Sequence, residues 1–217
     1  SAPLGCALPD VRAQLDGERA WLAYRDGRFR EAAEGHLEAL QASSGIVDRS
    51  VRALNAASAY LEAGLLDRAQ ALALDALAVA AERRLAAHEA RAAWVLRSAG
   101  YRRGDELSPD VDLALASARV GLSQLAGAVS LGEAVIAWRA HRPRLGHRLA
   151  QLAASMFVGE SRRWSRLLAR VVALLCASAP SESEAENLLA ECEACPLDRI
   201  AIQTAGALYR TRTAISR

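Results

Sequence analysis

Apolar residues recur along this chain at spacings of three and four residues, with polar residues between them. Residues spaced in this way share one face of an α-helix, whereas a half-buried strand alternates apolar and polar positions. The segment 160–177 illustrates the pattern, with apolar side chains at Trp164, Leu167, Leu168, Val171, Val172, Leu174 and Leu175. Ala and Leu dominate nearly every window and aromatics make up only 5% of the chain. Sheets are enriched in β-branched and aromatic residues, so the pattern predicts an all-α protein.

The chain also contains an internal repeat. Residues 27–40 and 64–77 align without a gap at an offset of 37 residues, which is about the length of one helix–turn–helix unit. The aligned pairs are Gly27 with Gly64, Phe29 with Leu66, Ala32 with Ala69, Leu37 with Leu74, Ala39 with Ala76 and Leu40 with Leu77. The pattern returns after Gly100, where Ala114 and Gly121-Leu122 take the positions of Ala69 and Ala76-Leu77 if residues 101–108 form an inserted loop.

At these positions the sequence resembles the tetratricopeptide repeat family. The second unit carries the spaced family residues Asn55, Ala59, Tyr60, Gly64, Leu66, Ala69, Ala76 and Leu77, with Leu66 in place of the usual aromatic. The first unit matches at Gly27, Phe29, Ala32 and Ala39. The resemblance implies an α-solenoid of antiparallel helix pairs, in which Gly caps the first helix of a pair and Ala lies where the two helices cross.

The expected organisation has three parts: an N-terminal extension over residues 1–10, three tetratricopeptide-like helix pairs over 11–125, and divergent repeats or capping helices over 126–217. The last part is predicted to hold helices at 131–140, 143–157, 160–177, from the Ser181–Glu184 capping box to about Cys195, and from Pro196 onward. We therefore expect about ten or eleven helices in all.

In tetratricopeptide arrays the first helix of each pair lines a concave groove, so the resemblance implies which residues face a partner. They are Trp21, Tyr24 and Arg25 in the first unit, Leu54, Asn55, Ser58, Leu61 and Glu62 in the second, and Arg91, Trp94 and Arg97 in the third. Aromatic residues beside guanidinium groups suit an acidic or amphipathic segment of another protein. Alternatively, Trp21 and Trp94 fill the repeat core. Asn55 is unusual inside a helix, and in the family this residue hydrogen-bonds the peptide backbone.

Every one of the 27 basic residues is arginine, which is typical of a GC-rich genome, and the net charge is only +2. Eight arginines gather in one stretch that has a single acid, Glu160: Arg139, Arg142, Arg144, Arg148, Arg162, Arg163, Arg166 and Arg170. This stretch is interpreted as a solvated face over an Ala/Leu core, with an acidic protein partner as the alternative. Nucleic acid is disfavoured, because the whole chain is not strongly basic and shows no recognised nucleic-acid fold.

Motifs for catalysis or metal binding are missing from the sequence. No Gly-rich phosphate loop, HExxH or G-x-S-x-G occurs, so neither an enzyme nor a cofactor is expected. Cys192 and Cys195 form a CxxC that lacks two further zinc ligands, and buried structural cysteines are the expectation. The histidines at 88, 141 and 147 are expected near the surface.

No apolar run reaches the roughly 18 residues of a membrane span, so no membrane partner is expected. The cytoplasm is the default location, while Leu4-Gly5-Cys6 is similar to the end of a lipoprotein cleavage site and leaves an exported or lipid-anchored protein open. The expected function is a protein–protein interaction module. The alternatives are a helical-repeat regulatory or sensory part of a larger bacterial signalling or transcription-regulator system, and a nucleic-acid binder through residues 139–170.

Overall fold

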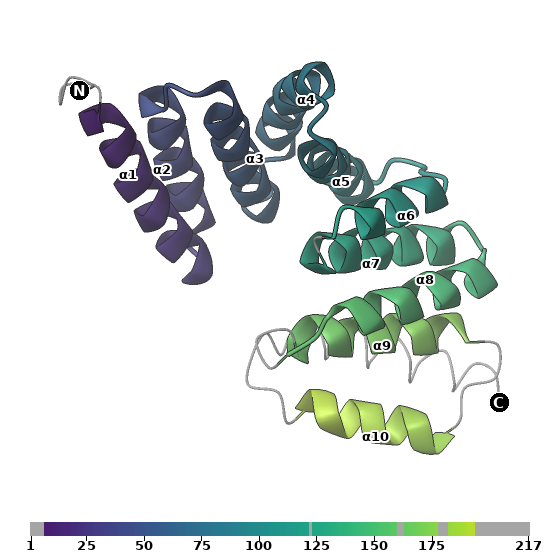
Figure 1. Cartoon of the computed structure of the whole chain (residues 1–217). Helices are drawn as coiled ribbons and strands as arrows, with labels where there is room; N and C mark the ends of the chain where they lie inside the picture. The colour runs from purple at the N-terminus through teal and green to yellow at the C-terminus, as the bar shows by residue number, and fades with distance from the viewer. Residues whose placement is uncertain (1–6, 122, 160–162, 178–181, 194–217) are drawn as a thin grey trace. The chain divides into compact units, whose positions relative to one another are not determined.

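A computed structural model of the chain describes residues 7–121, 123–159, 163–177 and 182–193, which form ten helices and no strand (Figure 1). The helices are α1 (Ala7–Arg25), α2 (Phe29–Ala42), α3 (Ile46–Glu62), α4 (Leu66–Arg83), α5 (Ala86–Arg103), α6 (Val111–Arg119), α7 (Ser123–Arg139), α8 (Pro143–Met156), α9 (Arg163–Cys176) and α10 (Glu182–Glu193). The all-helical prediction is confirmed. Across the described ranges, every helix is too short or too polar to span a membrane.

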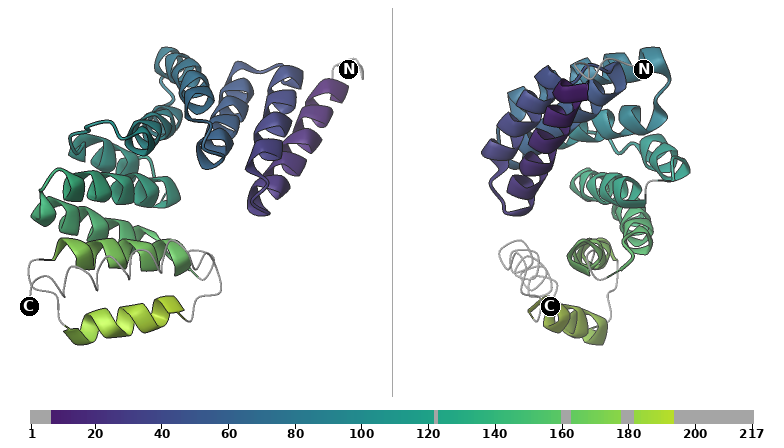
Figure 2. Two further views of the ribbon diagram at one scale, coloured as in Figure 1. Left: turned by 180° about the vertical axis from the view of Figure 1, so that it is seen from behind. Right: turned by 60° about the vertical axis from the view of Figure 1, so that its left-hand side comes forward.

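The chain divides into two compact units, residues 1–106 and 107–217. In the first unit each helix from α1 to α5 packs against the next one in chain order, and α5 also packs against α3 (Figures 1 and 2). In the second unit α6 to α10 follow the same order, and α9 also packs against α7. Both units are therefore built from helices that pack in adjacent pairs.

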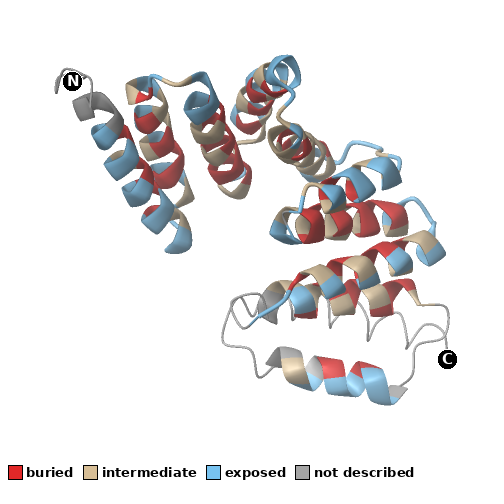
Figure 3. Cartoon of the chain, in the orientation of Figure 1, coloured by how far each residue is buried: buried red, intermediate tan, exposed pale blue. Residues whose placement is uncertain are grey.

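Alanine forms most of the core of the first unit. The main buried cluster consists of Ala23, Ala32, Ala33, Ala57, Ala59, Tyr60, Leu61, Ala69, Ala73, Val95 and Ala99. Figure 3 shows buried positions on the sides of α2 and α3 that face neighbouring helices. Small side chains at these positions let helices approach closely. The repeat alanines predicted at helix crossings, Ala32, Ala39, Ala69 and Ala76, are all buried, as the alignment implied.

Two glycines end the first helices of the first two predicted pairs. Gly27 follows α1 with a φ of 78°, and Gly64 follows α3 with a φ of 74°. L-residues rarely adopt this left-handed conformation, whereas glycine adopts it at little cost. The predicted glycine caps are confirmed at both positions.

Replacing Gly64 with Ala is expected to lower the free energy of unfolding by about 1 kcal/mol. A Cβ atom at Gly64 would meet nothing within 4 Å, so the cost comes from the backbone alone. Urea denaturation followed by circular dichroism measures this change. Gly132→Ala is the matched control, because its Cβ also meets nothing within 4 Å but lies in a helix that Ala stabilises. Equal effects of the two substitutions would contradict the role of φ.

The third predicted pair differs from the first two. Helix α5 continues through Arg103 and ends at Gly104, whose φ is 94°, so Gly100 is a buried helical residue and residues 101–103 do not belong to the loop. Helix α6 has only nine residues. Gly121, with a φ of 78°, therefore lies in a turn and does not match the helical Ala76. Leu122 lies outside the described residues.

Helix α6 begins at a carboxylate cap rather than at a repeat position. The Asp110 carboxylate accepts the backbone N–H of Leu113 at 2.8 Å. The backbone N–H of Asp110 in turn donates to the buried Glu133 of α7 at 2.6 Å. The two acids thus fix the start of α6 on α7 within the second unit.

The remaining boundaries follow the sequence closely except at α7, which begins at Ser123, well before the predicted start at residue 131. Helices α7, α8 and α9 cover most of the segments predicted at 131–140, 143–157 and 160–177, and Pro143 is the first residue of α8. Helix α1 already begins at Ala7, so residues 7–10 are helical rather than an extension. The compact units separate after Glu106, whereas the predicted division after residue 125 separates clear repeats from divergent ones. Ser181 of the capping box and the helix expected from Pro196 lie outside the described residues.

Candidate functional site

Polar side chains from four helices of the first unit, α1, α2, α3 and α5, gather into a single cluster. Its members are Tyr24, His36, Ser50, Arg52, Ser58, Glu62, His88, Arg91 and Arg102, and we call them the polar cluster. Each member is linked to another by a hydrogen bond or by the effect of its charge. The cluster contains both compact hydroxyls and long guanidinium groups.

Helical spacing on α3 and α5 brings most of these residues together. Ser58 and Glu62 are four residues apart and therefore lie on one side of α3, and Arg52 lies two turns before Ser58, toward the edge of that side. His88, Arg91 and Arg102 lie on one side of α5 for the same reason. Since α3 packs against α5, these two sides meet.

Arg91 is the central cation of the polar cluster. Its Nη2 donates to Ser58 Oγ at 3.2 Å, and Ser58 Oγ donates to the Leu54 carbonyl at 2.8 Å. Burial lowers the pKa of Arg91, while the Tyr24 hydroxyl acts in the opposite direction. Within the described ranges, no carboxylate forms an ion pair with Arg91.

The carboxylate in the cluster is matched by a different arginine. Arg102 donates from Nη1 to the Leu61 carbonyl at 2.6 Å and from Nη2 to Glu62 Oε2 at 2.9 Å. This pair joins the end of α3 to the end of α5. Burial, and then the Glu62 charge, raise the pKa of Tyr24, which Arg91 and Arg102 partly offset.

Two histidines lie beside the guanidinium groups. His36 of α2 is only 3% exposed, and its Nδ1 has no hydrogen-bond partner among the described residues. Burial, followed by the charges of Arg52 and Arg91, lowers the pKa of His36 to about 4. His88 is partly buried, with Nδ1 3.4 Å from Ser50 Oγ, and burial and Arg91 lower its pKa as well. His88 is therefore not the surface residue predicted.

Arg52 reaches from α3 to α1. A Cβ atom on Gly17 of α1 would overlap the Arg52 guanidinium, so the glycine gives this group its room. Like Arg91, Arg52 has no ion-pair partner within the part of the chain that the structure describes. With three guanidinium groups against the single carboxylate of Glu62, the polar cluster carries excess positive charge.

The structure brings together four residues that the sequence assigned to a partner: Tyr24, Ser58, Glu62 and Arg91. Asn55 lies on the same side of α3, partly buried, and its amide makes no hydrogen bond with the described residues. Sequence reasoning missed five members, His36, Ser50, Arg52, His88 and Arg102. Extending the α3 and α5 stripes by one turn would have found Arg52 and His88, but no pattern marked His36 of α2.

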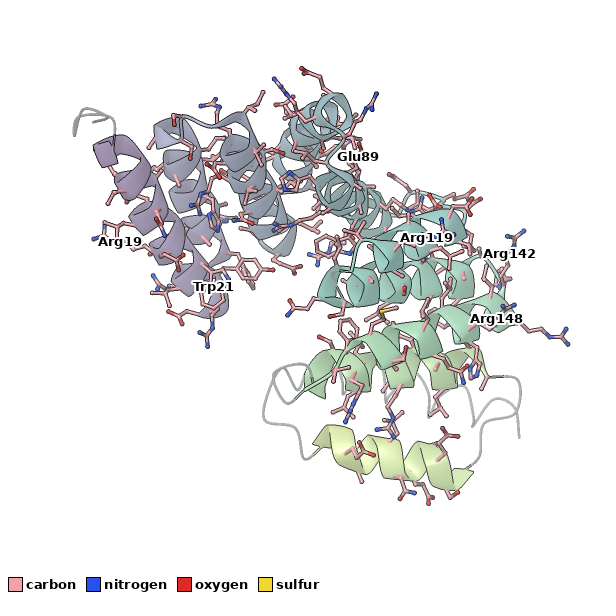
Figure 4. All side chains as sticks on the ribbon, in the orientation of Figure 1. Arg19, Trp21, Glu89, Arg119, Arg142 and Arg148 are labelled. Carbon is pink, nitrogen blue, oxygen red and sulfur yellow. The ribbon has the colours of Figure 1, made fainter. Side chains whose placement is uncertain are left out.

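Other predicted partner residues have different surroundings. Leu54 and Leu61 are wholly buried in alanine-rich cores, so their assignment to a groove is wrong. Trp94 is partly buried against the main core cluster, as the core-filling alternative held. Trp21 is 49% exposed on α1 (Figure 4), with the exposed Arg25 guanidinium 4.9 Å from its ring centroid. Arg97 is partly buried on α5.

The basic stretch lies in the second unit and does not behave as one group. Five of its arginines are exposed: Arg139, Arg142, Arg144, Arg148 and Arg166. Figure 4 shows Arg142 and Arg148 reaching away from the ribbon. Arg170 instead donates to Glu191 of α10 at 2.7 and 3.2 Å, which ties α9 to α10. His147, which was expected near the surface, is partly buried, and its Nδ1 lies 2.8 Å from the Ala173 carbonyl oxygen of α9. Arg162 and the Arg163 side chain lie outside the described residues.

Cys176 is buried at the end of α9. Cys6, Cys195 and the side chain of Cys192 lie outside the described residues. Among the residues that are described, no group of three or more His, Cys, Asp or Glu side chains is arranged to hold a metal ion.

Comparison of the chain with models of protein families, with curated proteins and with solved structures gives no match. The polar cluster and the helices that form it are therefore the features from which a function can be inferred.

Proposed function

We propose that the chain is a protein-binding module rather than an enzyme, built as a tetratricopeptide-like α-solenoid and located by default in the cytoplasm. Its ligand is an acidic or amphipathic segment of another protein. The segment lies along α1, α3 and α5, the first helices of the predicted pairs, and orders on binding.

One observation carries this proposal: side chains of α1, α3 and α5 converge in a polar cluster with excess positive charge. Arg52 and Arg91 have no carboxylate partner among the described residues, and partly buried cations are stable when an opposite charge reaches them. Arginine also forms two parallel hydrogen bonds with a carboxylate. An acidic partner would supply the missing charge.

The half-exposed Trp21 supports an amphipathic partner. Its ring stacks with Arg25 on α1, and Leu22 beside it is 53% exposed. Tryptophan and arginine are enriched at the centres of protein interfaces, where their large surfaces are buried by the partner.

The regulatory alternative would use the same face, with the chain acting as the sensory part of a larger signalling protein. The exposed arginines of α8 remain the basis of the nucleic-acid alternative.

Replacing Asn55 with Leu is expected to weaken partner binding roughly tenfold, because two or so amide hydrogen bonds to the partner backbone are lost. The thermal unfolding midpoint should shift by less than about 2 °C, since the side-chain amide of Asn55 makes no hydrogen bond with any described residue. Affinity purification with quantitative mass spectrometry compares the wild-type chain, Asn55→Leu and the exposed control Asp75→Leu of α4. Partners retained by Asn55→Leu together with a large loss of stability would show a structural role instead.

A further inference from the structure

We propose that Arg52, Arg91 and His36 form a subsite for a carboxylate of the bound partner, and that binding brings a proton onto His36. This inference rests on the proposed function and makes its ligand chemistry specific. The subsite is contributed by α2, α3 and α5, and therefore includes a helix that the repeat alignment places outside the binding face.

The two arginines provide the attraction. Both are partly buried and neither has an ion-pair partner among the described residues. Leaving a partly desolvated cation unmatched is unfavourable, and a bound carboxylate removes that penalty. The Ser58 hydroxyl already accepts one bond from Arg91, which leaves other guanidinium N–H groups for a ligand.

His36 provides the second, independent observation. Its Nδ1 is buried without a partner in the described part of the chain, although nearly all buried polar atoms in proteins have one. The charges that act on the ring are those of Arg52 on α3 and Arg91 on α5, and both are positive. An oxyanion held between these arginines would accept a hydrogen bond from His36. Its negative charge would also offset the two positive charges that act on the His36 ring.

This arrangement couples binding to pH. In the free chain, burial and the two guanidinium groups hold the pKa of His36 at about 4, so the ring is neutral near pH 7. A bound anion favours the imidazolium and raises this pKa toward its ordinary value. Since each unit of pKa change is a factor of ten in affinity, binding should tighten about tenfold between roughly pH 7.5 and pH 5.5. The pKa of His88 is lowered by burial and by the Arg91 charge as well, so a bound anion would shift it in the same direction.

The test uses the full chain with two probes, sulfate and a six-residue glutamate peptide, and the matching glutamine peptide as a blank. Sulfate keeps its charge across this pH range, so any change in its affinity with pH must come from protonation of groups on the protein. Isothermal titration calorimetry at constant ionic strength should show both anions binding about tenfold more tightly at the lower pH. Arg52→Gln should weaken both at least tenfold, His36→Gln should remove the pH dependence, and Arg142→Gln on the exposed start of α8 should change neither.

Histidine NMR of the wild-type chain gives a readout that needs no variant. Saturating sulfate should raise the pKa of one buried histidine by about two units, and this signal should be missing in His36→Gln. Equal sulfate binding by Arg52→Gln and Arg142→Gln would overturn the subsite. Arg52-dependent binding of sulfate without binding of the glutamate peptide would overturn the assignment to a partner carboxylate. If both probes fail while Asn55→Leu still loses its partners, this inference falls and the proposed function stands.

Discussion

Replacing Ala69 with Arg is expected to lower the free energy of unfolding of the first unit by about 4 kcal/mol. Ala69 is wholly buried on α4 in the main alanine-rich core. A guanidinium at this position must either push the helices apart or lose its water without gaining an opposite charge. Because folded domains are stable by only about 5–15 kcal/mol, such a loss removes much of the stability of the unit. Thermal unfolding followed by circular dichroism measures it.

The control is the same substitution two residues further along the same helix. Ala71 is exposed, so Ala71→Arg should change the free energy of unfolding by no more than about 0.5 kcal/mol. A tolerated Ala69→Arg combined with a damaging Ala71→Arg would mean that α4 presents a different face to its neighbours. The whole register of the repeat would then be wrong.

Acidification is expected to destabilise the first unit through His36. Its pKa is lowered from 6.5 to about 4 in the folded chain, so the unfolded chain takes up a proton at a higher pH than the folded chain does. The stability due to the neutral ring is therefore complete above about pH 6.5 and is lost as the pH falls toward 4. Between about pH 7 and pH 5 the loss from this residue should be about 2 kcal/mol. Urea denaturation at the two pH values, without polyvalent anions, measures it.

Replacing His36 with Leu should remove that part of the pH dependence. The ring is buried and its Nδ1 has no described partner, so an apolar side chain of similar size should be accepted near pH 7 at little cost. His141→Asn is the control, because His141 is exposed and has a φ of 56°, which Asn tolerates well. If His36→Leu and the wild-type chain lose the same stability on acidification, the effect comes from other groups.

Helix boundaries were predictable where they depend on a short segment of sequence and not where they depend on distant residues. The apolar spacing and Pro143 predicted α8 within one residue, because a proline at the first helical position and one apolar stripe are properties of a short segment. The third repeat departs from the alignment. The alignment predicts that its first helix ends at Gly100, yet α5 continues to Arg103, and a carboxylate cap at Asp110 starts a short α6. That helix start uses Glu133, which is 23 residues away and invisible to a repeat alignment.

The candidate site was predicted in part for the same reason. Tyr24, Ser58, Glu62 and Arg91 were found because they occupy equivalent places on first helices. His36 was missed because it lies on a second helix. Leu54 and Leu61 were wrongly assigned to the groove. Helix α3 contacts helices on more than one side, and these contacts bury residues that the family pattern places facing a ligand.

The sequence by itself determined that the chain is helical, that its repeat alanines are buried, and that Gly27 and Gly64 cap helices. Each depends on neighbours three or four residues away or on the φ of a single residue. Only the tertiary structure decided that Arg52, Arg91 and His36 meet without an opposing carboxylate among the described residues. The packing of α3 against α5 and α2 selects which faces touch, and long guanidinium side chains then reach residues far away in the sequence.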